Sequence, residues 1–103
     1  MTAADWLSTR TPRPPAALAA RIASLLTSSD EDGDLPEALT TAAEQTLRAL
    51  LHLNATDRAG ALDLLAADAL VTYAFEAAAD GPETLEARAT AAMHRLSSIA
   101  TAL

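Results

Sequence analysis

The sequence contains no cysteine and no lysine, and only three of its 103 residues are aromatic. Without cysteine the chain can form no disulfide, iron–sulfur cluster or thiolate zinc site. Valine and isoleucine together occur only three times, and no stretch alternates apolar with polar residues, so β-strands are not expected. No apolar run reaches the roughly 18 residues of a membrane-spanning helix, and the first residues lack the basic-then-apolar pattern of a secretory signal. These absences predict an all-α, cytoplasmic protein with no membrane insertion.

Acidic residues outnumber basic residues by 14 to 7, which gives a net charge of −7. Nucleic acids and anionic membrane surfaces are bound through basic patches, so neither is expected as a partner. Half of the residues are hydrophobic, but most of these are alanine and leucine, and alanine buries little area. A chain of this length forms one domain that buries about 65% of its unfolded surface. With so thin a core, we expect the chain to gain stability from a protein partner or from a second copy of itself.

Helix signals follow a short N-terminal arm, residues 1–14, which ends in prolines. Thr2 and Asp5 have the spacing of a capping box, which predicts one helical turn in the arm. Apolar residues then recur with helical spacing in four segments, 15–27, 35–53, 57–79 and 82–103. Short connections make neighbouring helices antiparallel. We therefore predict an antiparallel up-and-down four-helix bundle, residues 15–103, with the arm packed across it.

Cap residues predict where the two central helices begin and end. Asp34 and Glu37 have capping-box spacing at the start of the second helix. Asn54 can adopt the left-handed conformation that ends this helix. Asp57 or the residue before it can cap the third helix. The turn between these helices is therefore predicted to be short.

The third predicted helix, residues 57–79, carries apolar side chains over more than half of its circumference, including Leu64 and Leu70. This pattern predicts a central position in the bundle. The remaining arc combines small residues, one leucine and two acids, and is formed by Ala61, Leu65, Asp68, Ala69, Thr72, Glu76 and Ala79. The arc is either a solvated alanine-rich face or a subunit interface. Trp6, the only tryptophan, likewise either packs on its own bundle or fills a pocket on a partner. The candidate partner-binding residues are therefore Trp6 and six residues of the arc, namely Ala61, Leu65, Asp68, Ala69, Thr72 and Glu76.

Asp63 falls in the middle of the apolar arc of the third helix. An unpaired carboxylate in such a place would cost several kcal/mol, so a partner is required. We predict a buried polar residue bonded to an arginine such as Arg21 or Arg58, or placed near the positive end of the helix. The alternative, a catalytic general acid, lacks a companion. An enzyme or small-molecule carrier would need a cavity lined by Asp63, Tyr73 and Phe75.

No sequence pattern for catalytic, metal or cofactor chemistry is present. His52 and His94 fall on different helices, and neither has a glutamate three residues before it, as a helical di-iron site requires. The acidic segment 28–34 places Gly33 like the glycine of a calcium loop, but Leu39 occupies the position that requires a bidentate glutamate. Glycine-rich phosphate loops and a G-x-S-x-G turn are missing. We therefore predict a protein that is not an enzyme and has no catalytic residue, metal ligand or cofactor.

One segment of the third helix resembles a segment of the trans-isoprenyl diphosphate synthases, L-A-G-D-A-L-L-x-x-A-F-E. The matching residues here run from Leu64 to Glu76 and read L-L-A-A-D-A-L-V-T-Y-A-F-E, with Ala67 at the position of the glycine. The corresponding residues are Asp68, Ala69, Leu70, Phe75 and Glu76.

In that family this helix belongs to an all-helical fold and lies by the subunit interface. The two D-D-x-x-D motifs that bind magnesium and diphosphate there have no counterpart in this sequence, and the chain has about a third of a catalytic subunit's length. No catalytic residue is therefore carried over. The resemblance implies a noncatalytic helical interaction subunit, similar to the small subunits of heterodimeric prenyl diphosphate synthases.

The alternative function is a self-associating bundle, a homodimer with a structural or adaptor role. Its interface would be the arc of the third helix or a coiled-coil-like seam on the fourth helix. That seam consists of Leu85, Ala89, Ala92, Leu96, Ile99 and Leu103. The sequence leaves open which partner, ligand or oligomeric state applies.

Overall fold

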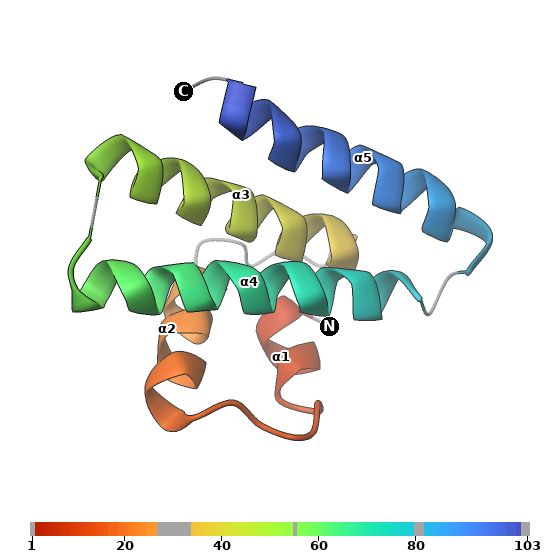
Figure 1. The fold of residues 1–103 in the computed structure, drawn as a ribbon. Coiled ribbons are helices and arrows are strands. Elements are labelled where there is room, and N and C mark those ends of the chain that lie inside the picture. Colours follow the sequence, from red (N-terminus) through yellow and green to blue (C-terminus); the bar gives the residue numbers. More distant parts are fainter. Residues whose placement is uncertain (1, 27–33, 55, 80–81, 102–103) are drawn as a thin grey trace.

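The structure, a computed structural model, describes residues 2–26, 34–54, 56–79 and 82–101. In these ranges every element of regular secondary structure is an α-helix (Figure 1). The helices are α1 (Ala3–Leu7), α2 (Ala16–Leu26), α3 (Leu35–Leu53), α4 (Arg58–Ala78) and α5 (Pro82–Thr101). The prediction of an all-α fold is confirmed, and the regular antiparallel four-helix bundle stays a prediction.

The helix ends follow the cap residues of the sequence in three places. The Thr2 side chain accepts a hydrogen bond from the Asp5 amide at 3.1 Å, and the Asp5 carboxylate accepts one from the Thr2 amide at 3.2 Å, so the capping box of α1 is present. Asn54 ends α3 in the left-handed conformation, with φ 50°. Asp57 caps α4, because its carboxylate accepts a hydrogen bond from the Gly60 amide at 2.8 Å. These local bonds orient the turn that brings α4 back along α3.

The helices α3 and α4 form a central antiparallel pair (Figure 1). The short helices α1 and α2 pack on one side of this pair, and α5 runs back along the other side. The structure therefore places α4 at the centre, as predicted for the third helix.

None of the helices in the described ranges is both long enough and apolar enough to cross a membrane.

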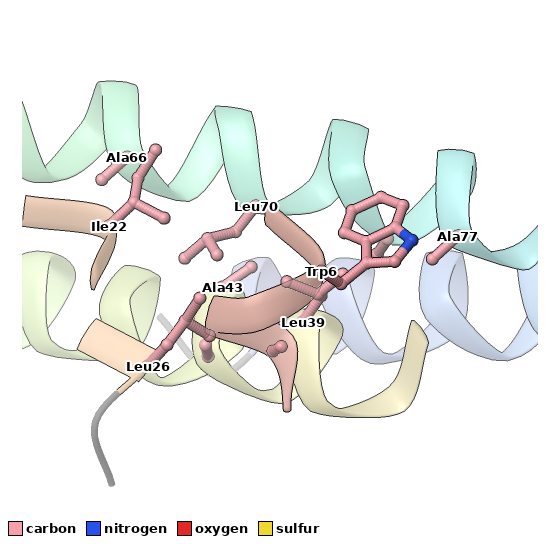
Figure 2. Packing of buried hydrophobic residues seen from close by; sticks show 11 residues of the cluster. Trp6, Ile22, Leu26, Leu39, Ala43, Ala66, Leu70 and Ala77 are labelled. Atoms are coloured by element: carbon pink, nitrogen blue, oxygen red, sulfur yellow. The ribbon is translucent and has the colours of Figure 1, made fainter. Parts of the chain in front are cut away.

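The main apolar cluster lies between the α3–α4 pair and the N-terminal helices (Figure 2). Leu39 on α3 and Leu70 on α4 are fully buried at its centre. Ile22 and Leu26 enter from α2, and Trp6 enters from α1. Alanines of α3 and α4 complete the cluster, and their small side chains allow the two central helices to approach closely.

Three features of the sequence lie outside the described residues. They are the acidic segment 28–33, the turn at 80–81 and Leu103 at the end of the predicted seam. The described part of the seam faces the central pair, since Ala92 and Ile99 are buried and Leu85, Ala89 and Leu96 are half-buried.

Candidate functional site

Polar bonds connect α5 to the first half of α3, and Arg95 is their centre. The Arg95 guanidinium donates hydrogen bonds to Glu44 Oε1, at 2.9 Å from Nε, and to Thr41 Oγ1 at 3.2 Å. It also forms an ion pair with Glu37. Glu37, Thr41 and Glu44 occur one turn apart on the same face of α3, so a single arginine of α5 spans two turns of its neighbour. The hydrogen bonds that Glu44 accepts from Arg95, and those from Arg48, hold the pKa of Glu44 below its ordinary value of 4.5, against the effect of burial.

A second arginine of α5 forms an ion pair at the start of α3. The Arg88 guanidinium lies 2.6 Å from Asp34 Oδ2. The prediction of a capping box formed by the side chains of Asp34 and Glu37 is therefore wrong. Asp34 occupies the N-cap position but makes no side-chain cap bond, because both carboxylates are bound by arginines of α5 instead.

Two hollows lie between α5 and the central pair. The larger has a volume of about 630 Å³ and lies beside the α3–α4 turn, with the last turns of α5 as its other wall. We call it the leucine groove, and it is lined by Leu47, Leu50, Leu51, Asn54, Thr56, Asp57, Gly60, Ala61, Leu64, Leu96, Ile99 and Ala100. The smaller hollow, of about 320 Å³, lies under the first half of α5 and shares Leu96 with the groove. The packing of α5 is therefore loose along much of its length.

Large leucine side chains are exposed at the groove and beside it. Leu51 is 43% exposed and Leu64 is 56% exposed, although Leu64 belongs to the predicted apolar side of its helix. The reason is that the last turns of α5 leave the turn end of the α3–α4 pair open at the groove. Leu53 and Leu65, at 71% and 57%, are exposed at the same end. Nothing in the spacing of Leu51 and Leu64 distinguishes them from core residues, so the groove could not be predicted from the sequence.

The arc predicted as a partner-binding surface lies on α4 and is largely exposed. We call it the α4 face, and it consists of Ala61, Leu65, Asp68, Ala69, Thr72 and Glu76. Ala69 is half-buried and the other five residues are exposed. The Glu76 carboxylate is 3.2 Å from the Arg10 guanidinium, and the Thr72 hydroxyl donates to the Asp68 carbonyl oxygen within the helix. Only Ala61 belongs both to this face and to the leucine groove.

Trp6, the other candidate contact residue, lies in the chain's own core and is only 7% exposed. Its ring meets that of Tyr73 edge to face, with centroids 6.2 Å apart, and the Arg10 guanidinium stacks over it at 4.6 Å. Of the two interpretations of Trp6, packing on its own helices is the one that the structure shows. A partner cannot use Trp6 as an anchor in this conformation.

Asp63 forms a two-pronged ion pair with Arg21, so one of its two predicted arginine partners is confirmed. Arg21 Nη2 donates to Asp63 Oδ2 at 3.0 Å, and Nε donates to Oδ1. The hydrogen bonds that Arg21 donates to Asp63 raise the pKa of Arg21 above its ordinary value. The Asp63 side chain is 25% exposed, so it is half-buried and not fully enclosed. This ion pair joins α2 to α4, and its bidentate geometry indicates a structural role.

The cavity that an enzyme or carrier would need is not formed by the three residues named for it. Phe75 lines the hollow of about 320 Å³, while Tyr73 lines a separate one of about 100 Å³ near α1 and α2. Asp63 lines neither of them. His52 and His94 are exposed on α3 and α5. Within the described ranges no three His, Asp or Glu side chains are grouped so that they could hold a metal ion.

Comparison with known proteins gives no relative from which a function could be transferred. No family model, curated protein or solved structure matches this chain.

Proposed function

We propose that this chain is a noncatalytic helical subunit that binds another protein through the α4 face. The observation that carries the proposal is the clustering of exposed leucines at one end of the α3–α4 pair. Among the described residues, five large hydrophobic side chains are exposed, and four of them lie between positions 51 and 65. Single exposed leucines are ordinary, but a cluster of them indicates a surface that a partner covers.

Leu65 is the leucine of this cluster that belongs to the α4 face. Ala61, Asp68 and Thr72 surround it on the same side of the helix, and their short side chains allow a second helix to approach closely. At its present exposure, burying Leu65 under a partner contributes about 1 kcal/mol to the free energy of binding. A complex with a micromolar Kd requires roughly 8 kcal/mol. The partner must therefore supply large side chains that pack around Leu65.

The specific partner that we propose is the catalytic subunit of a prenyl diphosphate synthase. The support is the resemblance of residues 64–76 to the interface helix of that family, since these residues include Leu65, Asp68, Ala69, Thr72 and Glu76. The chain would then act as the small subunit, and would influence the length of the prenyl product without touching the reacting atoms. An antiparallel bundle is the fold that we propose for the assembled subunit.

The test is capture of partners from native cells with the tagged chain and two matched variants. Leu65→Glu places a charge on the α4 face, whereas Leu64→Glu makes the same change at the neighbouring residue, which has nearly the same exposure but lines the groove. We expect the wild type and Leu64→Glu to retain a prenyl diphosphate synthase identified by mass spectrometry. Leu65→Glu should reduce its recovery at least tenfold.

Circular dichroism of both variants checks that each remains helical. Co-purification that contains no prenyl diphosphate synthase would remove the specific partner. A binding partner that is lost with Leu64→Glu and kept with Leu65→Glu would remove the α4 face as its binding surface.

A further inference from the structure

Arg58 and Asp68, two charged residues of α4, differ from most other charges of the molecule. In the ranges that the structure describes, neither side chain forms an ion pair or a hydrogen bond. Among the described acidic residues, Glu86 alone shares this state with Asp68. Each of the other six arginines is bonded, and their acceptors are Ser8, Asp34, Glu37, Glu44, Asp63 and Glu76.

Both charges lie on the same side of α4 as Leu65. Arg58 precedes Leu65 by two helical turns and Asp68 follows it by one, and all three residues are exposed. The ten residues from Arg58 to Asp68 span about 15 Å of helix. The α4 face therefore has a positive charge before its leucine and a negative charge after it.

The stability of α4 does not explain either charge. Arg58 begins the helix, where the positive end of the helix dipole disfavours a cation. Asp68 lies in the helix interior, where aspartate is among the less favourable residues, and no basic residue stands three or four positions away. Glu76, the other acid of the face, is paired with Arg10. Such departures from local preference concentrate at functional sites, so the two charges indicate contact with another molecule.

We propose that the partner of the α4 face binds through a helix of complementary charge. This helix places an acidic side chain opposite Arg58, a basic one opposite Asp68 and large apolar side chains around Leu65. The inference rests on the proposed function and adds the chemistry by which the partner is recognised. The acid and the base of the partner are then about ten residues apart, matching the spacing on α4.

This pattern fixes the direction of the partner helix as well as its identity. Turning the helix end to end would bring its base to Arg58 and its acid to Asp68, and like charges would then face each other at both ends of the contact. Charges at the rim of an interface contribute mainly to specificity and to the rate of association. The leucine supplies the burial, and the two charges select the partner.

The experiment measures binding to the prenyl diphosphate synthase that the tagged wild type retains, purified and titrated with the full chain. Titrations at about 50 and about 500 mM NaCl compare weak with strong screening. Arg58→Glu and Asp68→Lys should each raise the Kd about tenfold at the lower salt and about twofold at the higher. Glutamate is favoured in the first turn of a helix, and lysine is a better helix former than aspartate, so both variants should stay folded.

The matched control is Glu86→Lys, which makes the same change of charge as Asp68→Lys at an exposed residue of α5. It should change the Kd less than about twofold, because it lies outside the α4 face. An Asp68→Lys variant that binds as tightly as Glu86→Lys overturns the inference.

The double variant Arg58→Glu/Asp68→Lys separates the pattern from the net charge, since it keeps the net charge of −7 and reverses both ends. The two sites are about 15 Å apart, so their effects should add to about a hundredfold rise in the Kd at the lower salt. A double variant that binds like the wild type would mean that only net charge matters, which overturns the inference.

A second copy of this chain is the other candidate occupant, because α4 itself carries a base and an acid at this spacing. Sedimentation equilibrium of the chain alone should give the monomer mass of 10.6 kDa. In a two-fold contact each single reversal would break the charge pairs and the double variant would restore them. A wild-type dimer that behaves in this way overturns the inference.

Failure of the inference and failure of the proposed function give different results. A synthase that is lost with Leu65→Glu and bound equally by every charge variant overturns the inference and leaves the proposed function intact. A wild type that retains no synthase removes the proposed function, and the inference with it.

Discussion

The two sides of the α3–α4 pair are held by different kinds of interaction. On the side of α1 and α2, Trp6, Ile22 and Leu26 are buried against the pair and form most of the apolar core. On the side of α5, the described part of that helix contributes Ala92 and Ile99 as buried residues and Leu85, Ala89 and Leu96 as half-buried ones, and arginines add ion pairs and hydrogen bonds. The first side therefore depends mainly on burial, and the second depends more on directional polar bonds.

The difference shows what each kind of interaction can achieve in a chain with few large apolar residues. Burial contributes about 2 kcal/mol for each large side chain but specifies orientation weakly. The bonds of Arg95 to Glu44 and Thr41 specify the register of α5 on α3, yet each contributes little net free energy because its groups leave water. We therefore expect α5 to be the helix that opens most easily, and the hollows beneath it agree with this expectation.

The largest predicted effect comes from removing a side chain at the centre of the apolar side. Leu70→Ala should reduce the free energy of unfolding by about 3–4 kcal/mol, because Leu70 is fully buried and its removal leaves a cavity. Leu96→Ala, the same change beside the existing hollows, should cost about 1 kcal/mol. Urea unfolding followed by circular dichroism measures both. Equal losses would show that the two sides do not differ in the way described.

A smaller effect is predicted for the polar side. Arg95→Gln should destabilise the chain by about 1–2 kcal/mol, because Glu44 keeps a partly buried carboxylate without its main partner. The control is Arg48→Gln, which removes the i,i+4 partner of the same glutamate at an exposed site and should cost less than about 0.5 kcal/mol.

Hydrogen exchange then tests whether the Arg95 bonds act locally. The amides of α5 should exchange faster in Arg95→Gln, while those near Leu39 and Leu70 should change only as far as global stability falls. Uniform acceleration across all helices would mean that α5 and the core open together, which would contradict the comparison.

Features decided within one or two helical turns could be predicted from the sequence. The capping box of Thr2 and Asp5, the left-handed Asn54 and the cap at Asp57 all follow from local geometry, and the structure contains each of them. The positions of the long helices follow from the same short-range pattern. A charged residue in an apolar arc also requires a partner, which is why Arg21 could be named as one candidate for Asp63.

Features decided by distant contacts could not be predicted. Asp34 and Glu37 have the spacing of a capping box, but they bind Arg88 and Arg95, more than fifty positions away. Helical spacing likewise shows which side of a helix is apolar, and does not show whether a neighbour covers that side along its whole length. Leu64 is therefore exposed on the apolar side of α4, and the groove beside it became visible only in three dimensions.

The smallest predicted effect is the pH dependence of the polar side, through Glu44. Its pKa is held below the ordinary value of 4.5 chiefly by the hydrogen bond from Arg95. A carboxylate with a lowered pKa in the folded state contributes stability that is complete above its unfolded pKa and is lost as the pH falls through the folded value. The free energy of unfolding of the wild type should therefore decline between about pH 5 and pH 3.

Glu44→Gln isolates the part of this decline that belongs to the α5 contact. The amide still accepts a hydrogen bond but does not titrate, so the variant should start less stable at neutral pH and lose less free energy on acidification. Glu86→Gln, the same change at an exposed residue of α5, serves as the control and should keep the wild-type profile. Parallel pH profiles for the wild type and Glu44→Gln would mean that the Arg95 bonds do not hold α5 in solution. In that case both sides of the central pair would depend on burial alone.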